Sequence, residues 1–133
     1  MQVTDVWIYR DKSQLGYDPT SGKDITGFKV EALDGSIGKV DNSTNDVGAS
    51  FIVVDTGPWI FGKKVMLPAG TIQRIDENEE QVWVNRTKDQ IKNAPEYDEM
   101  NPGDQGRHQE IGTYYGAGGP GYRDWDDPSS PPR

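Results

Sequence analysis

Short apolar segments separated by glycine, proline, asparagine or aspartate recur about every ten residues through the middle of this 133-residue chain, and this spacing limits the fold more than any other feature. The segments are too short to be core-forming helices and have the usual length of β-strands. They lie at residues 28–32, 37–40, 50–56, 63–67, 71–75 and 81–85. The sequence predicts a small, mainly β fold of six strands, either a barrel or a sandwich. A closed barrel has the advantage that it leaves no exposed strand edges.

In two of these segments, residues 28–32 and 81–85, apolar side chains occupy alternate positions, as in strands with one buried face. Residues 28–32 alternate apolar with charged side chains. Val82 and Val84 flank Trp83, which is expected on the opposite face of its strand. Residues 50–56 form the most hydrophobic segment and are expected at the centre of the sheet.

One short helix is predicted after the last strand. Thr87 and Gln90 have the spacing of a capping box, in which each side chain satisfies a backbone N–H group of the other residue. Ile91 and Ala94 are expected to face the sheet. Pro95 ends the helix because proline disfavours the helical conformation in the residue before it.

The regions on either side of the strands differ in composition. We expect residues 1–19 to be an N-terminal extension, residues 20–98 to be the folded domain, and residues 99–133 to be a disordered acidic tail. The tail holds seven Gly and five Pro and few aliphatic side chains, so it cannot bury enough surface to fold alone. Residues 93–133 also carry eight acidic and three basic side chains, which is most of the net charge of −8.

The residue types predict no catalytic site, no cofactor and no metal centre. There is no cysteine, and the only histidine, His108, falls in the predicted tail. Residues 41–46 resemble a calcium loop but lack its Gly and Glu, and the acids of residues 76–80 are expected to be exposed turn charges. An acid-catalysed hydrolase would rest on abundant carboxylates alone, and we disfavour it.

Charge and hydropathy also bear on partners and location. A negative chain without a basic stripe is not expected to bind nucleic acid. The longest apolar stretch, residues 51–54, is too short to span a bilayer, and the N-terminus lacks the features of a signal peptide. We therefore expect a cytoplasmic protein.

The candidate partner-binding residues are large apolar residues outside the six predicted strands: three lie in a connection between strands, which is normally exposed, and two lie in the N-terminal extension. These are Trp59, Ile60, Phe61, Trp7 and Tyr9. Either they cover an end of the barrel or they form an interface, with another protein or with a second copy of the chain in a dimer. Aromatic residues of the tail are either contacts for a partner or simply tolerated there. They are Tyr114, Tyr115, Tyr122 and Trp125.

Three stretches of the chain resemble the PRC-barrel family. The stretch GFKVEALDGSIGKV at residues 27–40 looks like the opening hairpin of these domains. The stretches VVDTGPWIFGKKVMLP at residues 53–68 and TKDQIKNAPEY at residues 87–97 look most like stand-alone bacterial members, some of which are associated with stress responses. The family also occurs in the H subunit of the purple-bacterial photosynthetic reaction centre and in a ribosome maturation factor.

The resemblance implies a six-stranded barrel that serves as an adaptor in protein assemblies, and it implies no catalytic residues. We therefore expect a non-enzymatic protein-binding or scaffold module with an unknown protein partner. The alternative is a barrel that binds a small ligand or a metal ion at its mouth.

Overall fold

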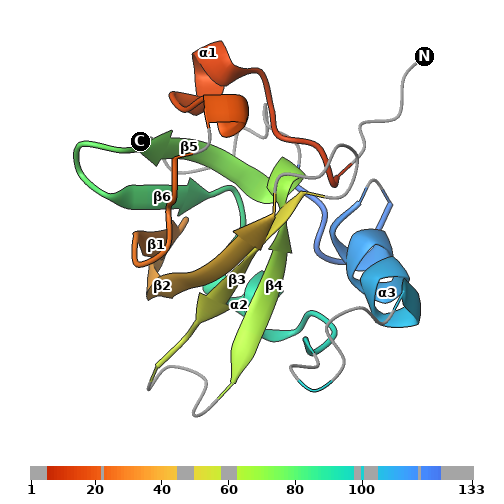
Figure 1. The fold of residues 1–133 in the computed structure, drawn as a ribbon. Helices are drawn as coiled ribbons and strands as arrows, with labels where there is room; N and C mark the ends of the chain where they lie inside the picture. The colour runs from red at the N-terminus through yellow and green to blue at the C-terminus, as the bar shows by residue number, and fades with distance from the viewer. Residues whose placement is uncertain are drawn as a thin grey trace.

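All six predicted segments form β-strands in the computed structural model, which describes residues 6–21, 23–44, 50–57, 63–97, 100, 105–116 and 118–123. The strands are β1 (Lys29–Ala32), β2 (Gly35–Thr44), β3 (Phe51–Asp55), β4 (Lys64–Pro68), β5 (Ile72–Asp76) and β6 (Gln81–Val84). The helices within these residues are α1 (Lys12–Leu15), α2 (Lys88–Lys92) and α3 (Gln105–Tyr115), with 3₁₀ turns at Pro19–Ser21 and Ala69–Thr71 (Figure 1). The predicted mainly β fold is confirmed.

The strands form one mixed sheet in the order β4-β3-β2-β1-β6-β5. β1 and β6 run parallel, and the other neighbouring pairs are antiparallel. The outer strands β4 and β5 are joined by Ala69–Thr71 alone, so the sheet must curl until its two edges approach each other at that corner. Figure 1 shows β5 and β6 on one side of the curl and β2, β3 and β4 on the other. No ladder joins β4 to β5 in the described residues, so a closed barrel is not shown.

One face of the sheet is apolar and buried. Val82 and Val84 of β6 are fully buried and Trp83 lies on the outer face, as the alternation predicts. β3 buries three consecutive residues and has a strand on each side, which suits the most hydrophobic segment. The core comprises Leu15, Tyr17, Ile25, Phe28, Val30, Ala32, Ile37, Val40, Ile52, Val54, Met66, Leu67, Ile72, Ile75, Val82, Val84, Ile91, Ile111 and Tyr115.

Helix α2 has the predicted capping box. The Thr87 hydroxyl accepts the Gln90 backbone N–H at 3.2 Å, and the Gln90 side-chain oxygen accepts the Thr87 N–H at 2.9 Å. A carboxylate oxygen of Asp34, in the β1–β2 turn, accepts the Lys88 N–H at 2.8 Å. Because these acceptors satisfy N–H groups of the first turn, they allow a helix of five residues to form, and Ile91 anchors it in the core.

The packed unit begins before residue 20, which was the predicted start of the domain. Leu15 and Tyr17 are buried, and α1 lies against β5. Farther upstream, the Val6 carbonyl accepts the Gly70 N–H and the Trp7 carbonyl accepts the Ser50 N–H, at 2.6 and 2.9 Å. The N-terminal segment is therefore tied to the corner where β4 turns into β5.

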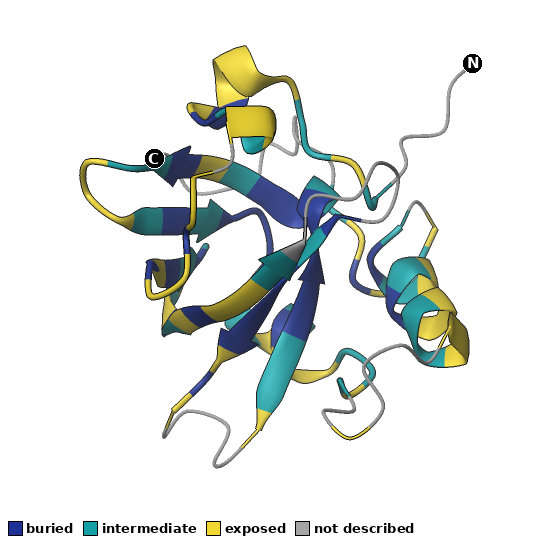
Figure 2. Cartoon of the chain, in the orientation of Figure 1, coloured by how far each residue is buried: buried dark blue, intermediate teal, exposed yellow. Residues whose placement is uncertain are grey.

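Helix α3 differs from the disordered tail that composition predicts for residues 99–133. It is polar overall, but Ile111 and Tyr115 have no exposed surface. Figure 2 shows the exposed residues of α3 on the side away from the sheet. The segment needs no core of its own, because two large side chains one turn apart complete an apolar surface that the sheet already presents.

If α3 is part of the folded unit, Ile111→Ala will lower the free energy of unfolding by about 2–5 kcal/mol, the usual cost of truncating a buried aliphatic side chain. Urea unfolding of the full chain, followed by circular dichroism, measures this change. The exposed Thr113 of the same helix provides the control, since Thr113→Ala should change the free energy by less than about 0.5 kcal/mol. Equal stability of the two variants would show that α3 does not dock.

Candidate functional site

Four of the residues predicted to contact partners lie outside the described residues. They are Trp59, Ile60, Phe61 and Trp125. The roles suggested for them stay predictions.

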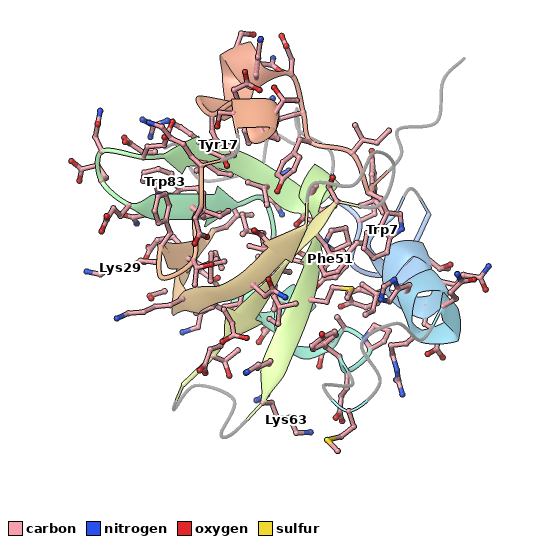
Figure 3. All side chains as sticks on the ribbon, in the orientation of Figure 1. Trp7, Tyr17, Lys29, Phe51, Lys63 and Trp83 are labelled. Atoms are coloured by element: carbon pink, nitrogen blue, oxygen red, sulfur yellow. The ribbon has the colours of Figure 1, made fainter. Side chains whose placement is uncertain are left out.

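Trp7 lies where the N-terminal segment, the sheet and α3 meet. Its indole contacts the ring of Phe51 edge-on, with centroids 6.1 Å apart, and stacks on the His108 ring at 5.8 Å. Figure 3 shows Trp7 beside Phe51 and next to α3. Tyr9 also packs against the core, and burial raises the pKa of its phenol. Both side chains are partly buried against the core, and the partner-binding role suggested for them stays a prediction.

The tail aromatic residues have separate positions. Tyr115 is a core residue, and burial raises the pKa of its phenol. Tyr114 is partly buried, and its hydroxyl donates a 2.6 Å hydrogen bond to the Gln90 carbonyl of α2. Tyr122 is 42% exposed. Two of the three thus hold α3 in place, and Tyr122 is the most exposed of the three.

Arg86 is a buried cation that lies beneath the end of α3. Its guanidinium donates to the carbonyls of Asn85 and Tyr115, at 2.7 and 3.2 Å, and lies about 6 Å from the ring centres of Tyr115 and Tyr122. Burial lowers the pKa of this guanidinium to about 10. The Tyr115 carbonyl is at the C-terminus of α3, where the helix dipole is negative, so the contact compensates part of the cost of burying the charge.

A groove of about 460 Å³ lies between the outer face of β5–β6 and the N-terminal segment. Its lining residues are Arg10, Gln14, Gln73, Arg74 and Trp83, and we call it the Arg10–Trp83 groove. Figure 3 shows Trp83 on this side of the sheet, below the segment that carries Tyr17. None of its lining residues was a predicted site residue.

A β-bulge positions the strand wall of the groove. The register steps from the Ile72–Val84 pair to the Arg74–Trp83 pair, so Gln73 is an extra residue in β5. Strict alternation from Ile72 would place Arg74 on the core side, and the bulge places it outside instead. The sequence contains a signal for this, because two buried residues three apart, Ile72 and Ile75, do not fit a regular two-residue period.

The same register brings Arg74 over Trp83 as a cross-strand pair. The guanidinium carbon is 4.7 Å from the indole centroid, within the range of a cation–π contact. One guanidinium nitrogen of Arg74 also donates to the Asp76 carboxylate at 3.1 Å. The cation is therefore held at a fixed place on the rim, although its side chain is 52% exposed.

The opposite wall comes from residues far away in the sequence, Arg10 and Gln14 of the N-terminal segment. Arg10 donates to the Gln73 carbonyl at 3.3 Å, which ties it to the bulge. Gln14 belongs to α1, which ends at Gly16 in the left-handed conformation. A Cβ atom on Gly16 would lie 3.2 Å from the Ile75 carbonyl, so glycine lets α1 approach β5 closely.

The groove offers hydrogen-bond donors and positive charge. The described residues of its lining contribute two guanidinium groups, two carboxamides and an indole, and none of them carries a carboxylate. In the part of the chain that the structure describes, there is no group of three or more His, Asp or Glu side chains that could hold a metal ion. A second groove, of about 490 Å³, runs along α3 past Tyr114, Pro95 and Pro120, and none of the described residues that line it is cationic.

The sequence matches no protein-family model and no curated protein. Among the described residues, no helix has both the length and the hydropathy that a membrane span requires.

The buried phenols generate a prediction for alkaline pH. Tyr9 and Tyr115 have raised pKa values in the folded state, whereas an unfolded tyrosine titrates near pH 10. Above about pH 10 the unfolded chain loses phenol protons that the folded chain retains, so the free energy of unfolding falls as pH rises.

Tyr115→Phe should make this fall less steep, because it removes one of the groups. At pH 7 the variant should be as stable as the wild type or more stable by about 1 kcal/mol, since the Tyr115 hydroxyl is buried without a hydrogen-bond partner among the described residues. Urea unfolding at pH 7 and at several values from about pH 9 to 11 tests both statements. Arg86 is present in both proteins, so a pH slope equal to that of the wild type would contradict the expectation.

Proposed function

We propose that this chain is a non-enzymatic protein-binding module of the PRC-barrel type, and that the Arg10–Trp83 groove is its docking site. The observation that carries the proposal is the Arg74–Trp83 pair on the outer face of the sheet, at the rim of a groove with a second arginine. Tryptophan and arginine are the residue types most enriched among those that dominate the affinity of protein interfaces.

The rigidity of the groove also supports a binding role. Arg74 is held by Trp83 and Asp76, Arg10 by the Gln73 carbonyl, and Trp83 by a strand whose neighbouring residues are in the core. Binding to side chains that are already ordered costs less conformational entropy than binding to mobile ones.

The adaptor class rests on the resemblance of residues 27–40, 53–68 and 87–97 to PRC-barrel proteins. The six strands and the short link between β4 and β5 are compatible with a barrel of that type. In such a barrel the interior is filled by side chains, which leaves the outer surface for partners. The partner is another protein or a second copy of this chain.

A second candidate function is small-ligand binding, and the volume of the groove favours it. Pockets that bind small molecules commonly measure about 300–1,000 Å³, and this groove falls in that range. With two arginines in the lining, such a ligand would carry a carboxylate or a phosphate.

The docking proposal predicts that Arg74→Ala will reduce the capture of the chain's protein partners from extracts of its host by about tenfold, the effect of losing one charge-assisted contact. Quantitative mass spectrometry of the captured proteins and light scattering of the purified chain measure binding to other proteins and to itself. Stability should change by less than about 1 kcal/mol, because the contacts of Arg74 with described side chains are an exposed ion pair and a cation–π contact.

Lys39→Ala is the matched control, since Lys39 is an exposed strand cation that does not line the groove. It should retain the wild-type partners and mass. If Arg74→Ala also retains them, the groove is not the docking site. Thermal unfolding with carboxylate and phosphate metabolites examines the second candidate, which requires a rise in midpoint that Arg74→Ala abolishes.

A further inference from the structure

Charge complementarity at the Arg10–Trp83 groove points to a particular class of partner. We propose that the groove recognises a short acidic segment of a partner protein, with a carboxylate bound by Arg74 and Arg10 beside the indole of Trp83. This inference rests on the proposed function and adds the chemical feature of the partner that the docking site recognises.

The local charge of the groove is opposite to that of the chain. The protein has a net charge of −8, yet the described residues that line the groove include two arginines and no acidic residue, and Asp76, which pairs with Arg74 beside the groove, offsets only one of the two positive charges. At physiological salt, exposed charges farther than about 8 Å away are largely screened, so the guanidinium groups in contact with a ligand dominate its binding. The surplus acidic charge elsewhere disfavours long polyanions such as nucleic acids, which extend beyond the groove.

Arg74 retains donors for an incoming carboxylate. Its contact with Asp76 uses one terminal nitrogen, and a guanidinium has five N–H donors. Asp76 also accepts the backbone N–H groups of Asn78 and Glu79, at 2.9 and 3.1 Å, so it is fixed in the β5–β6 turn. A ligand carboxylate can therefore bind the other side of the Arg74 fork while Asp76 stays in place.

The uncharged lining suits a peptide better than an inorganic anion. Gln14 is exposed on α1, and a carboxamide offers one acceptor and two donors, which match the N–H and C=O groups of a peptide backbone. Trp83 adds a partly exposed flat apolar surface. The matching segment therefore has an acidic residue next to an apolar or aromatic one.

The test compares two sets of synthetic nonapeptides. In the first, one Asp and one Glu flank a central Phe, Leu or Trp, and the remaining positions are Gly and Ser. In the second, Asn and Gln replace the two acids. Binding of each fluorescein-labelled peptide to the full chain is measured by fluorescence anisotropy, for the wild type, Arg74→Ala and the control Lys39→Ala.

The acidic peptides should bind the wild type and Lys39→Ala at least about tenfold more tightly than the amide peptides, as expected for a charge-assisted contact. That difference should fall below about twofold in Arg74→Ala and should also shrink as salt is raised. Inorganic phosphate should displace the acidic peptides only at concentrations well above their dissociation constants.

Equal binding of the acidic and amide peptides would overturn the inference, and so would a preference that survives in Arg74→Ala. Displacement by phosphate at the peptides' own concentrations would also overturn it, because the groove would then bind any small oxyanion. Host-protein capture separates this failure from that of the proposed function. Partners lost in Arg74→Ala without a preference for acids would preserve the docking site and remove only its acidic specificity.

Discussion

The curled sheet turns an apolar face inward, and short strands cannot exclude water from the ends of that face. Leu15 and Tyr17 from the N-terminal segment pack on one part of it, and Ile111 and Tyr115 from α3 pack on another. Burial of this shared surface explains why the N-terminal segment and α3 are ordered although short isolated helices are not stable in water. The groove depends on the same packing, because α1 and Arg10 form its second wall only while Leu15 is in the core.

The strands and α2 were predictable because their information is local. A two-residue period marks a strand within five residues, and the capping box of Thr87 and Gln90 spans a single turn. Helix α3 was not predictable in this way. Its order depends on Ile111 and Tyr115 meeting a sheet formed by distant residues, and composition alone does not encode that contact.

The candidate site was predictable only in part. Alternation placed Trp83 on the outer face of β6, and the spacing of Ile72 and Ile75 indicates the bulge that turns Arg74 outward. The approach of Arg10 to Gln73 joins residues 63 positions apart, and no local pattern predicts it. Trp7, a predicted contact residue of the N-terminal extension, packs against Phe51 and His108.

The guanidinium beneath α3 has a consequence for how this chain can be divided. A fragment that stops after residue 98 would contain all six of the described strands, but Arg86 would lose the Tyr115 carbonyl as an acceptor and the surrounding apolar surface would be exposed to solvent. The Arg86 guanidinium would then lie beside apolar surface that α3 no longer covers. The glycine-rich, polar stretch looks dispensable by composition, yet it supplies the acceptor and the apolar cover of a buried cation. Truncated versions of the protein should therefore retain it.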